Sequence, residues 1–210
     1  MNKRLQEVRK VVLEYQHFVE GREKTKDSLK KKYLDGDLAK NSYEEQVKDL
    51  KNINDAKTKS YHAINETAGA YQEELDSWAI LKGEDLTDDL KLLNSPIQLN
   101  AEDYEALEGK YQYNYSMLKA IKDHARKNDV TYVRVSSVDK NEKLETFEKF
   151  VEDAKNMVET IRFDGQRNYT VALWDKEESF NKLYADTSRI LQTGKDKRKI
   201  IHGNGKVTWE

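Results

Sequence analysis

Two stretches of the chain carry hydrophobic seams with the same spacing, and together they limit the fold more than any other feature of the sequence. In both, seam positions follow one another in alternating steps of three and four residues, which is the coiled-coil period. The first seam, within residues 2–34, consists of Leu5, Val8, Val12, Tyr15, Val19, Arg22, Lys26, Leu29 and Tyr33. The second, within residues 43–81, consists of Tyr43, Val47, Leu50, Asn54, Lys57, Tyr61, Ile64, Ala68, Tyr71, Leu75 and Trp78. The sequence therefore predicts a long antiparallel coiled-coil hairpin over residues 1–81.

The turn between the seams sets their register. Asp35-Gly36-Asp37 ends the first helix, because glycine readily adopts the left-handed conformation found at helix C-termini. Folding the chain back so that Tyr33 faces Tyr43 aligns the other apolar positions as the pairs Leu5–Tyr71, Val8–Ala68, Val12–Ile64, Tyr15–Tyr61 and Leu29–Val47. The same register places Arg22 opposite Asn54. We interpret this polar layer as a feature that fixes the register, and the alternative is a point at which the hairpin bends or opens.

The rest of the chain predicts shorter elements. A capping box of Ser42 and Glu45 starts the second hairpin helix, which we expect to continue to Leu81. Further helices are predicted over residues 100–108, 114–127, 139–161 and 175–192. Residues 130–138 are a short strand or an extended linker, residues 169–174 are an apolar run of undetermined type, and the tail is suited to a small β-hairpin. The predicted organisation is a hairpin (1–81), a small helical segment (82–129), a C-terminal helical pair (130–194) and a basic and apolar tail (195–210).

The composition agrees with a mainly all-α fold made of long exposed helices. Charged residues make up 36% of the chain and hydrophobic residues 37%, with one proline and nine glycines. Acidic residues (39) nearly balance basic ones (37), so there is no global attraction to nucleic acid or to an anionic membrane. The absence of cysteine excludes disulfides, thiolate metal sites and cysteine nucleophiles.

No catalytic or metal-binding pattern is found in the sequence. The histidines fit neither H-x-x-x-H nor H-E-x-x-H; they are His17, His62, His124 and His202. Helical carboxylate pairs such as Glu73 with Asp76 are typical of a solvated helix face. A diiron site needs two matching Glu-x-x-His motifs, and this spacing occurs once in the chain, at Glu14 and His17. Phosphate-loop and G-x-S-x-G patterns are also absent. We therefore predict a protein that is not an enzyme and that has no catalytic residues, no metal site and no cofactor.

Two groups of residues are candidates for contact with a protein partner. Tyr111, Tyr113 and Tyr115 lie close together, and alternate residues cannot all face one helix core, so we predict an exposed aromatic cluster. A locally packed turn is the alternative. The second group consists of the apolar residues of the tail, which flank a glycine-rich turn: Ile200, Ile201, Val207 and Trp209.

A basic stripe on the helix over 114–127 raises a different possibility. Lys119, Lys122 and Arg126 follow one face, and Lys127 is adjacent. Together with the preceding helix, this arrangement is compatible with a DNA-binding helix-turn-helix, although Asp123 interrupts the stripe. The alternative function is therefore a regulatory nucleic-acid-binding protein.

The middle of the chain resembles a known group of proteins. The stretch from Leu92 to Leu99, with the helical segments Asn100–Leu107 and Asn114–Ile121, resembles part of uncharacterised helical proteins of Gram-positive tailed phages and prophages. The resemblance covers the segment around residues 92–128 and implies a structural or accessory role in a phage particle.

We expect a non-enzymatic, phage-encoded assembly or interaction protein, such as a capsid accessory or scaffolding component, in which the hairpin acts as a rigid arm. The expected partners are proteins, among them phage capsid or assembly proteins and further copies of this chain; neither a membrane nor, outside the alternative above, a nucleic acid is expected. No signal peptide is evident and no run approaches the about 20 apolar residues of a membrane span, so the host cytoplasm or the virion is the expected location. A phage inhibitor of a host enzyme is a further alternative.

Overall fold

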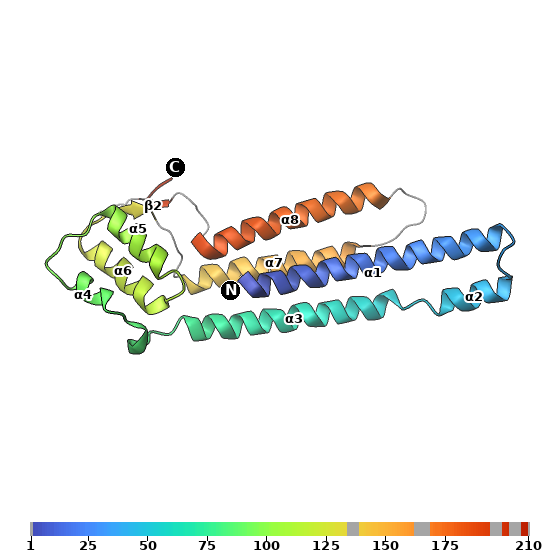
Figure 1. The fold of residues 1–210 in the computed structure, drawn as a ribbon, viewed down its shortest axis with the longest axis horizontal. Helices are drawn as coiled ribbons and strands as arrows, with labels where there is room; N and C mark the ends of the chain where they lie inside the picture. Colours follow the sequence, from blue (N-terminus) through green and yellow to red (C-terminus); the bar gives the residue numbers. More distant parts are fainter. Residues whose placement is uncertain (1, 134–138, 162–168, 194–198, 202–206, 210) are drawn as a thin grey trace. The chain divides into compact units, whose positions relative to one another are not determined.

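The computed structural model describes residues 2–133, 139–161, 169–193, 199–201 and 207–209 and confirms the mainly all-α fold. Figure 1 shows the elements in chain order. Four long helices dominate: α1 (Asn2–Leu34), α3 (Ile53–Trp78), α7 (Lys140–Thr160) and α8 (Tyr169–Thr193). The shorter elements are α2 (Lys40–Lys48), the 3-10 helix η1 (Gly83–Asp85), α4 (Asp89–Leu93), α5 (Ala101–Lys110), α6 (Tyr115–Lys127), β1 (Tyr132–Val133), β2 (Lys199–Ile201) and β3 (Val207–Trp209). No helix among the described residues combines the length and the apolar character needed to cross a membrane.

The chain divides into two compact units. Unit 1 comprises the described residues of Ala70–Glu148 and Ala185–Glu210, and unit 2 comprises those of Asn2–Gly69 and Lys149–Tyr184. The helices α3, α7 and α8 each contribute residues to both units. The predicted hairpin and the predicted C-terminal helical pair therefore take part in both.

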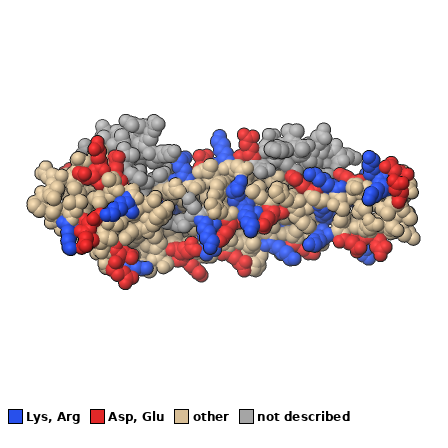
Figure 2. Space-filling view, in the orientation of Figure 1, with Lys and Arg blue, Asp and Glu red and all other residues tan. Residues whose placement is uncertain are grey.

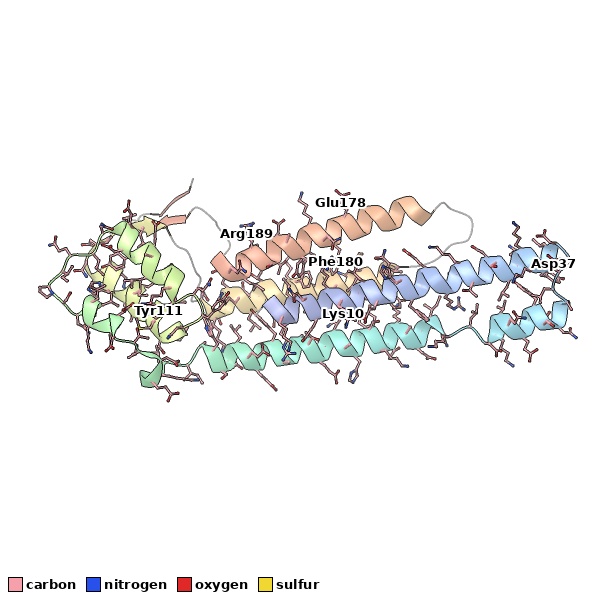
Figure 3. The ribbon with its side chains drawn as sticks, in the orientation of Figure 1. Lys10, Asp37, Tyr111, Glu178, Phe180 and Arg189 are labelled. Carbon is pink, nitrogen blue, oxygen red and sulfur yellow. The ribbon has the colours of Figure 1, made fainter. Side chains whose placement is uncertain are left out.

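Unit 2 is a helical bundle with one apolar core. Its buried residues come from α1, α3, α7 and α8 and include Val8, Val12, Tyr15, Val19, Ile64, Phe150, Val151, Ala154, Val158 and Phe180. Phe180 points from α8 toward α7 (Figure 3), where its ring stacks on that of Phe150 with the centroids 5.4 Å apart. Burial of each such side chain contributes on the order of 1.5–3 kcal/mol. A hydrogen bond also joins α1 to α8, from Arg9 Nε to Asn181 Oδ1 at 2.9 Å.

The predicted turn and register of the hairpin are confirmed at its far end. Helix α1 ends at Leu34, and Gly36 adopts a left-handed conformation with φ of 84°. The rings of Tyr33 and Tyr43 stack with their centroids 5.1 Å apart. This is one of the pairs of the predicted register, in which the numbers of facing residues sum to 76.

The prediction of one continuous second helix is wrong. Helix α2 ends at Lys48 and α3 begins at Ile53. The side-chain oxygen of Asn52 accepts a hydrogen bond from the backbone N–H of Asn54 (2.9 Å), which starts the new helix. Arg22 does not pair with Asn54; its Nε donates to the carbonyl oxygen of Lys51 at 2.9 Å. The polar layer therefore coincides with a break in the second arm, where backbone carbonyls are free to accept such a bond.

The predicted start of this arm is also wrong. Helix α2 begins at Lys40, and its N-cap residue Ala39 makes no side-chain capping bond. Ser42 and Glu45 thus lie inside the helix, where the backbone N–H of Glu45 takes part in the regular helical hydrogen bonding and is not available to the Ser42 hydroxyl.

In unit 1, the predicted short helices are confirmed. Asn100 and Asp103 form a reciprocal capping box at the start of α5, and the side chain of Asn114 accepts from the N–H of Met117 at the start of α6. One part of the core consists of Leu93, Tyr104, Leu107, Ile121 and Ala125. In another, Tyr71 of α3 stacks on Phe147 of α7 with the centroids 3.9 Å apart.

The strands form one small antiparallel sheet in unit 1. The order is β1-β2-β3, with Tyr132 opposite Ile201 and Ile200 opposite Thr208. The predicted β-hairpin of the tail is therefore present and pairs with β1. Among the described residues of the run 130–138, Tyr132 and Val133 form a strand, and residues 134–138 lie outside the described residues. The undetermined run 169–174 is helical and belongs to α8.

Candidate partner-binding site

Two of the three predicted tyrosines line a depression in the surface of unit 1. Its volume is about 450 Å³, and it is open to solvent. The lining residues come from the end of α3, from the segment that follows it and from the start of α6: Glu73, Glu74, Ser77, Trp78, Lys82, Asp85, Tyr113 and Tyr115. On α3, Tyr71 and Leu75 are buried while Glu73, Glu74 and Ser77 are exposed, so the amphipathic pattern of this helix presents its polar face to the depression.

Hydrogen bonds hold the two sides of the depression together. The indole Nε1 of Trp78 donates to the carbonyl oxygen of Tyr113 at 3.0 Å. The N–H of Lys82 donates to Ser116 Oγ (2.9 Å), and Asn114 Nδ2 donates to the carbonyl oxygen of Asp85 (2.7 Å). Backbone groups take part in all of these bonds, so the shape of the depression is set by the path of the chain.

The aromatic side chains of the depression are partly or largely exposed. Tyr113 is 68% exposed, and the rings of Trp78 and Tyr115 meet edge to face with centroids 5.1 Å apart and an interplanar angle of 65°. The segment after α3 adds two further exposed apolar residues, Ile80 (54%) and Leu81 (60%). Exposed apolar side chains grouped in this way are characteristic of protein-binding surfaces.

Tyr111 has a different environment from the other two tyrosines. Its hydroxyl donates to Asp89 Oδ2 at 2.8 Å and lies 2.7 Å from Thr87 Oγ1. Lys110 Nζ is 2.7 Å from the same carboxylate oxygen. The hydrogen bonds from Lys110 and Tyr111 hold the pKa of Asp89 below its usual value. Tyr111 therefore belongs to a locally packed turn, the alternative considered for the cluster.

The predicted basic stripe is divided among several environments. Lys119 and Lys127 are exposed, but Lys122 is half-buried, with its Nζ 3.8 Å from an oxygen of the buried Glu108. Arg126 Nη2 lies 3.2 Å from Asp123 Oδ1. On the face shown in Figure 2, acidic and basic side chains of the described residues are interspersed. This arrangement gives little support to binding along a phosphate backbone, which favours an uninterrupted basic surface.

Glu108 belongs to a buried polar network that sequence reasoning missed. Glu108 is fully buried and accepts a hydrogen bond from the hydroxyl of Tyr132 in β1 at 2.6 Å. The hydroxyl of Tyr104 lies 2.7 Å from His124 Nδ1, and burial raises the pKa of Tyr104. The network joins α5, α6 and β1. We assign it a structural role, because these polar groups are paired with one another inside unit 1.

The predicted tail residues lie in the sheet. Ile200 and Ile201 are in β2, which pairs with strands on both sides, and Val207 and Trp209 are in β3 at the edge. Their side chains lie outside what the structure describes, and their contact with a partner stays a prediction.

Within the described residues, no group of three His, Asp or Glu side chains could hold a metal ion. Comparison of the chain with protein-family models, with curated proteins and with solved structures gives no match. The candidate site is therefore supported by its geometry alone.

Sequence reasoning identified the tyrosines of the depression but missed Trp78, Glu73, Lys82 and Asp85. Trp78 occupies the last position of the second seam, and was assigned to packing within the hairpin. A usable signal was present, since Trp78 is the last residue of α3 and an acidic, glycine-containing segment follows it.

Proposed function

We propose that the protein is a non-enzymatic interaction protein that uses the depression of unit 1 to bind a protein partner. The observation that carries this proposal is the grouping of Trp78, Tyr113 and Tyr115 around one open depression. Aromatic side chains are enriched at the centres of protein interfaces, because they bury a large area at a small cost in conformational entropy.

The resemblance of the middle segment to phage proteins suggests the setting. In that setting, the partner is a capsid or assembly protein of a phage, and binding takes place in the host cytoplasm or in the virion.

The proposal is tested by quantitative affinity purification from the cells that produce the protein. The tagged full chain is compared with Tyr113→Ala and with the control Gln46→Ala, an exposed residue of α2 in unit 2. Truncation of one central aromatic side chain typically weakens an interface by about 2 kcal/mol, or roughly thirtyfold. We expect a partner that the wild type and Gln46→Ala retain and that Tyr113→Ala loses. Retention of the same proteins in equal amounts by all three chains would contradict the proposal.

A further inference from the structure

We propose that the depression recognises a lysine or arginine side chain of the partner protein. This inference rests on the proposed function, because it names the chemistry of the partner that the same depression binds. Three features support it: the aromatic walls of the depression, its charge and the way in which this chain holds its own cations.

The aromatic walls have the geometry of a cation site. Trp78 and Tyr115 meet at 65° with their centroids 5.1 Å apart, and Tyr113, which also lines the depression, is 68% exposed. A cation is attracted to the face of an aromatic ring when it lies within about 6 Å of the centroid. Rings set at a steep angle around one depression can contact the same cation from different sides.

The charged residues of the lining favour a cation as well. Three of them are acidic (Glu73, Glu74 and Asp85) and one is basic (Lys82). The acidic groups come from two separate segments, α3 and η1, so they lie at different parts of the lining. A long basic side chain can place its aliphatic stem on the rings and its charged group beside a carboxylate.

The chain binds its own cations in this way. In unit 2, Lys57 Nζ lies 6.0 Å from the ring centroid of Tyr61 and 2.6 Å from Glu159 Oε2. In unit 1, the buried Lys143 has its Nζ 5.4 Å from the ring of Trp78, and it donates to the carbonyl oxygen of Leu191. The lining of the depression combines the same kinds of group, aromatic rings and carboxylates.

The size and openness of the depression indicate a side chain on a protein surface. A volume of about 450 Å³ accommodates one long side chain with part of its neighbours, and the depression is open rather than enclosed. Because hydrogen bonds between side chains and the backbone hold its two sides together, a partner can bind without first ordering the site.

The test is an NMR titration of the ¹⁵N-labelled full chain with short peptides. The probes are acetyl-Gly-Leu-Lys-Leu-Gly-amide and two peptides that carry norleucine or glutamate in place of lysine. The readout is the indole N–H signal of Trp78, assigned by its absence in Trp78→Phe. We expect the lysine peptide to shift this signal and the norleucine peptide to bind about threefold more weakly or worse, which is the change expected for an exposed cation–π contact.

Two substitutions in the lining should change the affinity for the lysine peptide in opposite directions. Asp85→Asn should weaken binding of the lysine peptide, and Lys82→Met should strengthen it, each by about two- to fivefold and less at high salt. The control Glu44→Gln, at an exposed acid of α2, should leave the affinity unchanged.

Equal binding of the lysine and norleucine peptides would overturn recognition of a cation and leave the proposed function intact, because an apolar partner could still use the depression. No shift of the Trp78 signal with any peptide would also overturn this inference. The affinity purification described above tests the proposed function separately.

Discussion

The two units place the same kinds of side chain in different environments. In unit 2, Tyr61 donates to Glu159 Oε2 at 2.8 Å, and Lys57 pairs with the same carboxylate oxygen at 2.6 Å. In unit 1, Tyr113 is 68% exposed and lines a depression with three acidic residues. Tyr61 is hydrogen-bonded to a carboxylate of another helix, whereas the side chain of Tyr113 is largely exposed. The two tyrosines therefore differ in how much of the side chain is accessible for contact with another molecule.

The largest contrast is expected in stability. Phe150→Ala removes a fully buried ring of unit 2 that stacks on Phe180, and should lower the free energy of unfolding by about 3–5 kcal/mol. Tyr113→Ala should change it by less than about 0.5 kcal/mol, since the side chain is largely exposed. Urea denaturation followed by circular dichroism measures both. If Tyr113→Ala lowered the free energy of unfolding as much as Phe150→Ala does, Tyr113 would be part of a core.

Within unit 1, the buried polar network should contribute more to the stability of the fold than the surface charges do. Glu108→Ala removes the acceptor of the Tyr132 hydroxyl and leaves Lys122 without this carboxylate, which should cost about 1–3 kcal/mol. Glu102→Ala, at an exposed acid in the first turn of the same helix, is the matched control and should cost about 0.5 kcal/mol or less. Thermal unfolding of the two variants decides whether the network has the structural role assigned to it.

The break in the second arm provides a smaller effect within unit 2. Asn52→Ala removes the side-chain acceptor for the N–H of Asn54 and should cost about 1 kcal/mol, within the usual range of 0.5–2 kcal/mol for a helix cap. Asn41→Ala, at an exposed residue near the start of α2, is the control, because the N-cap of that helix makes no side-chain bond. If urea denaturation shows that both substitutions lower the free energy of unfolding by the same amount, Asn52 does not act as a helix cap.

The smallest effect is a dependence on alkaline pH. Burial, followed by the hydrogen bond to Glu159, raises the pKa of Tyr61 to about 12 from the usual 10.0. The unfolded chain therefore loses this proton first, and the stability contributed by Tyr61 is complete below pH 10 and declines as the pH rises toward 12. Tyr61→Phe should show a shallower decline over this window. Spectrophotometric titration of tyrosine absorbance in the two chains should lack one late-titrating group in the variant, and identical titration curves would contradict the assignment.

The hydrophobic periodicity of the sequence predicted the regular helices. It did not predict the place where a helix is interrupted, because that place is set by individual tertiary contacts. The heptads predicted helix α1 and the pairing of Tyr33 with Tyr43. They did not predict the break after Lys48, because residues 49–52 contain neither glycine nor proline. The break depends instead on Asn52 as a cap and on the bond from Arg22 to the Lys51 carbonyl.

The candidate site was predictable only in part for a similar reason. Tyr113 and Tyr115 could be identified because alternate residues cannot share one helix face. The contributions of Trp78 and Asp85 depend on the fold, since their segments meet residues 111–117 through the ring contact of Trp78 with Tyr115 and through hydrogen bonds such as that from Asn114 to the Asp85 carbonyl. Spacing in the sequence carries no information on such bonds.

The most direct test of the account is photo-crosslinking in the cells that produce the protein. A photoreactive phenylalanine analogue is placed at Tyr113 in the depression or, in a separate chain, at Gln46 on the surface of unit 2. The account predicts a defined protein adduct from position 113 and none from position 46. Adducts of equal yield from both positions, or none from position 113, would contradict the claim that the depression of unit 1 is a partner-binding surface.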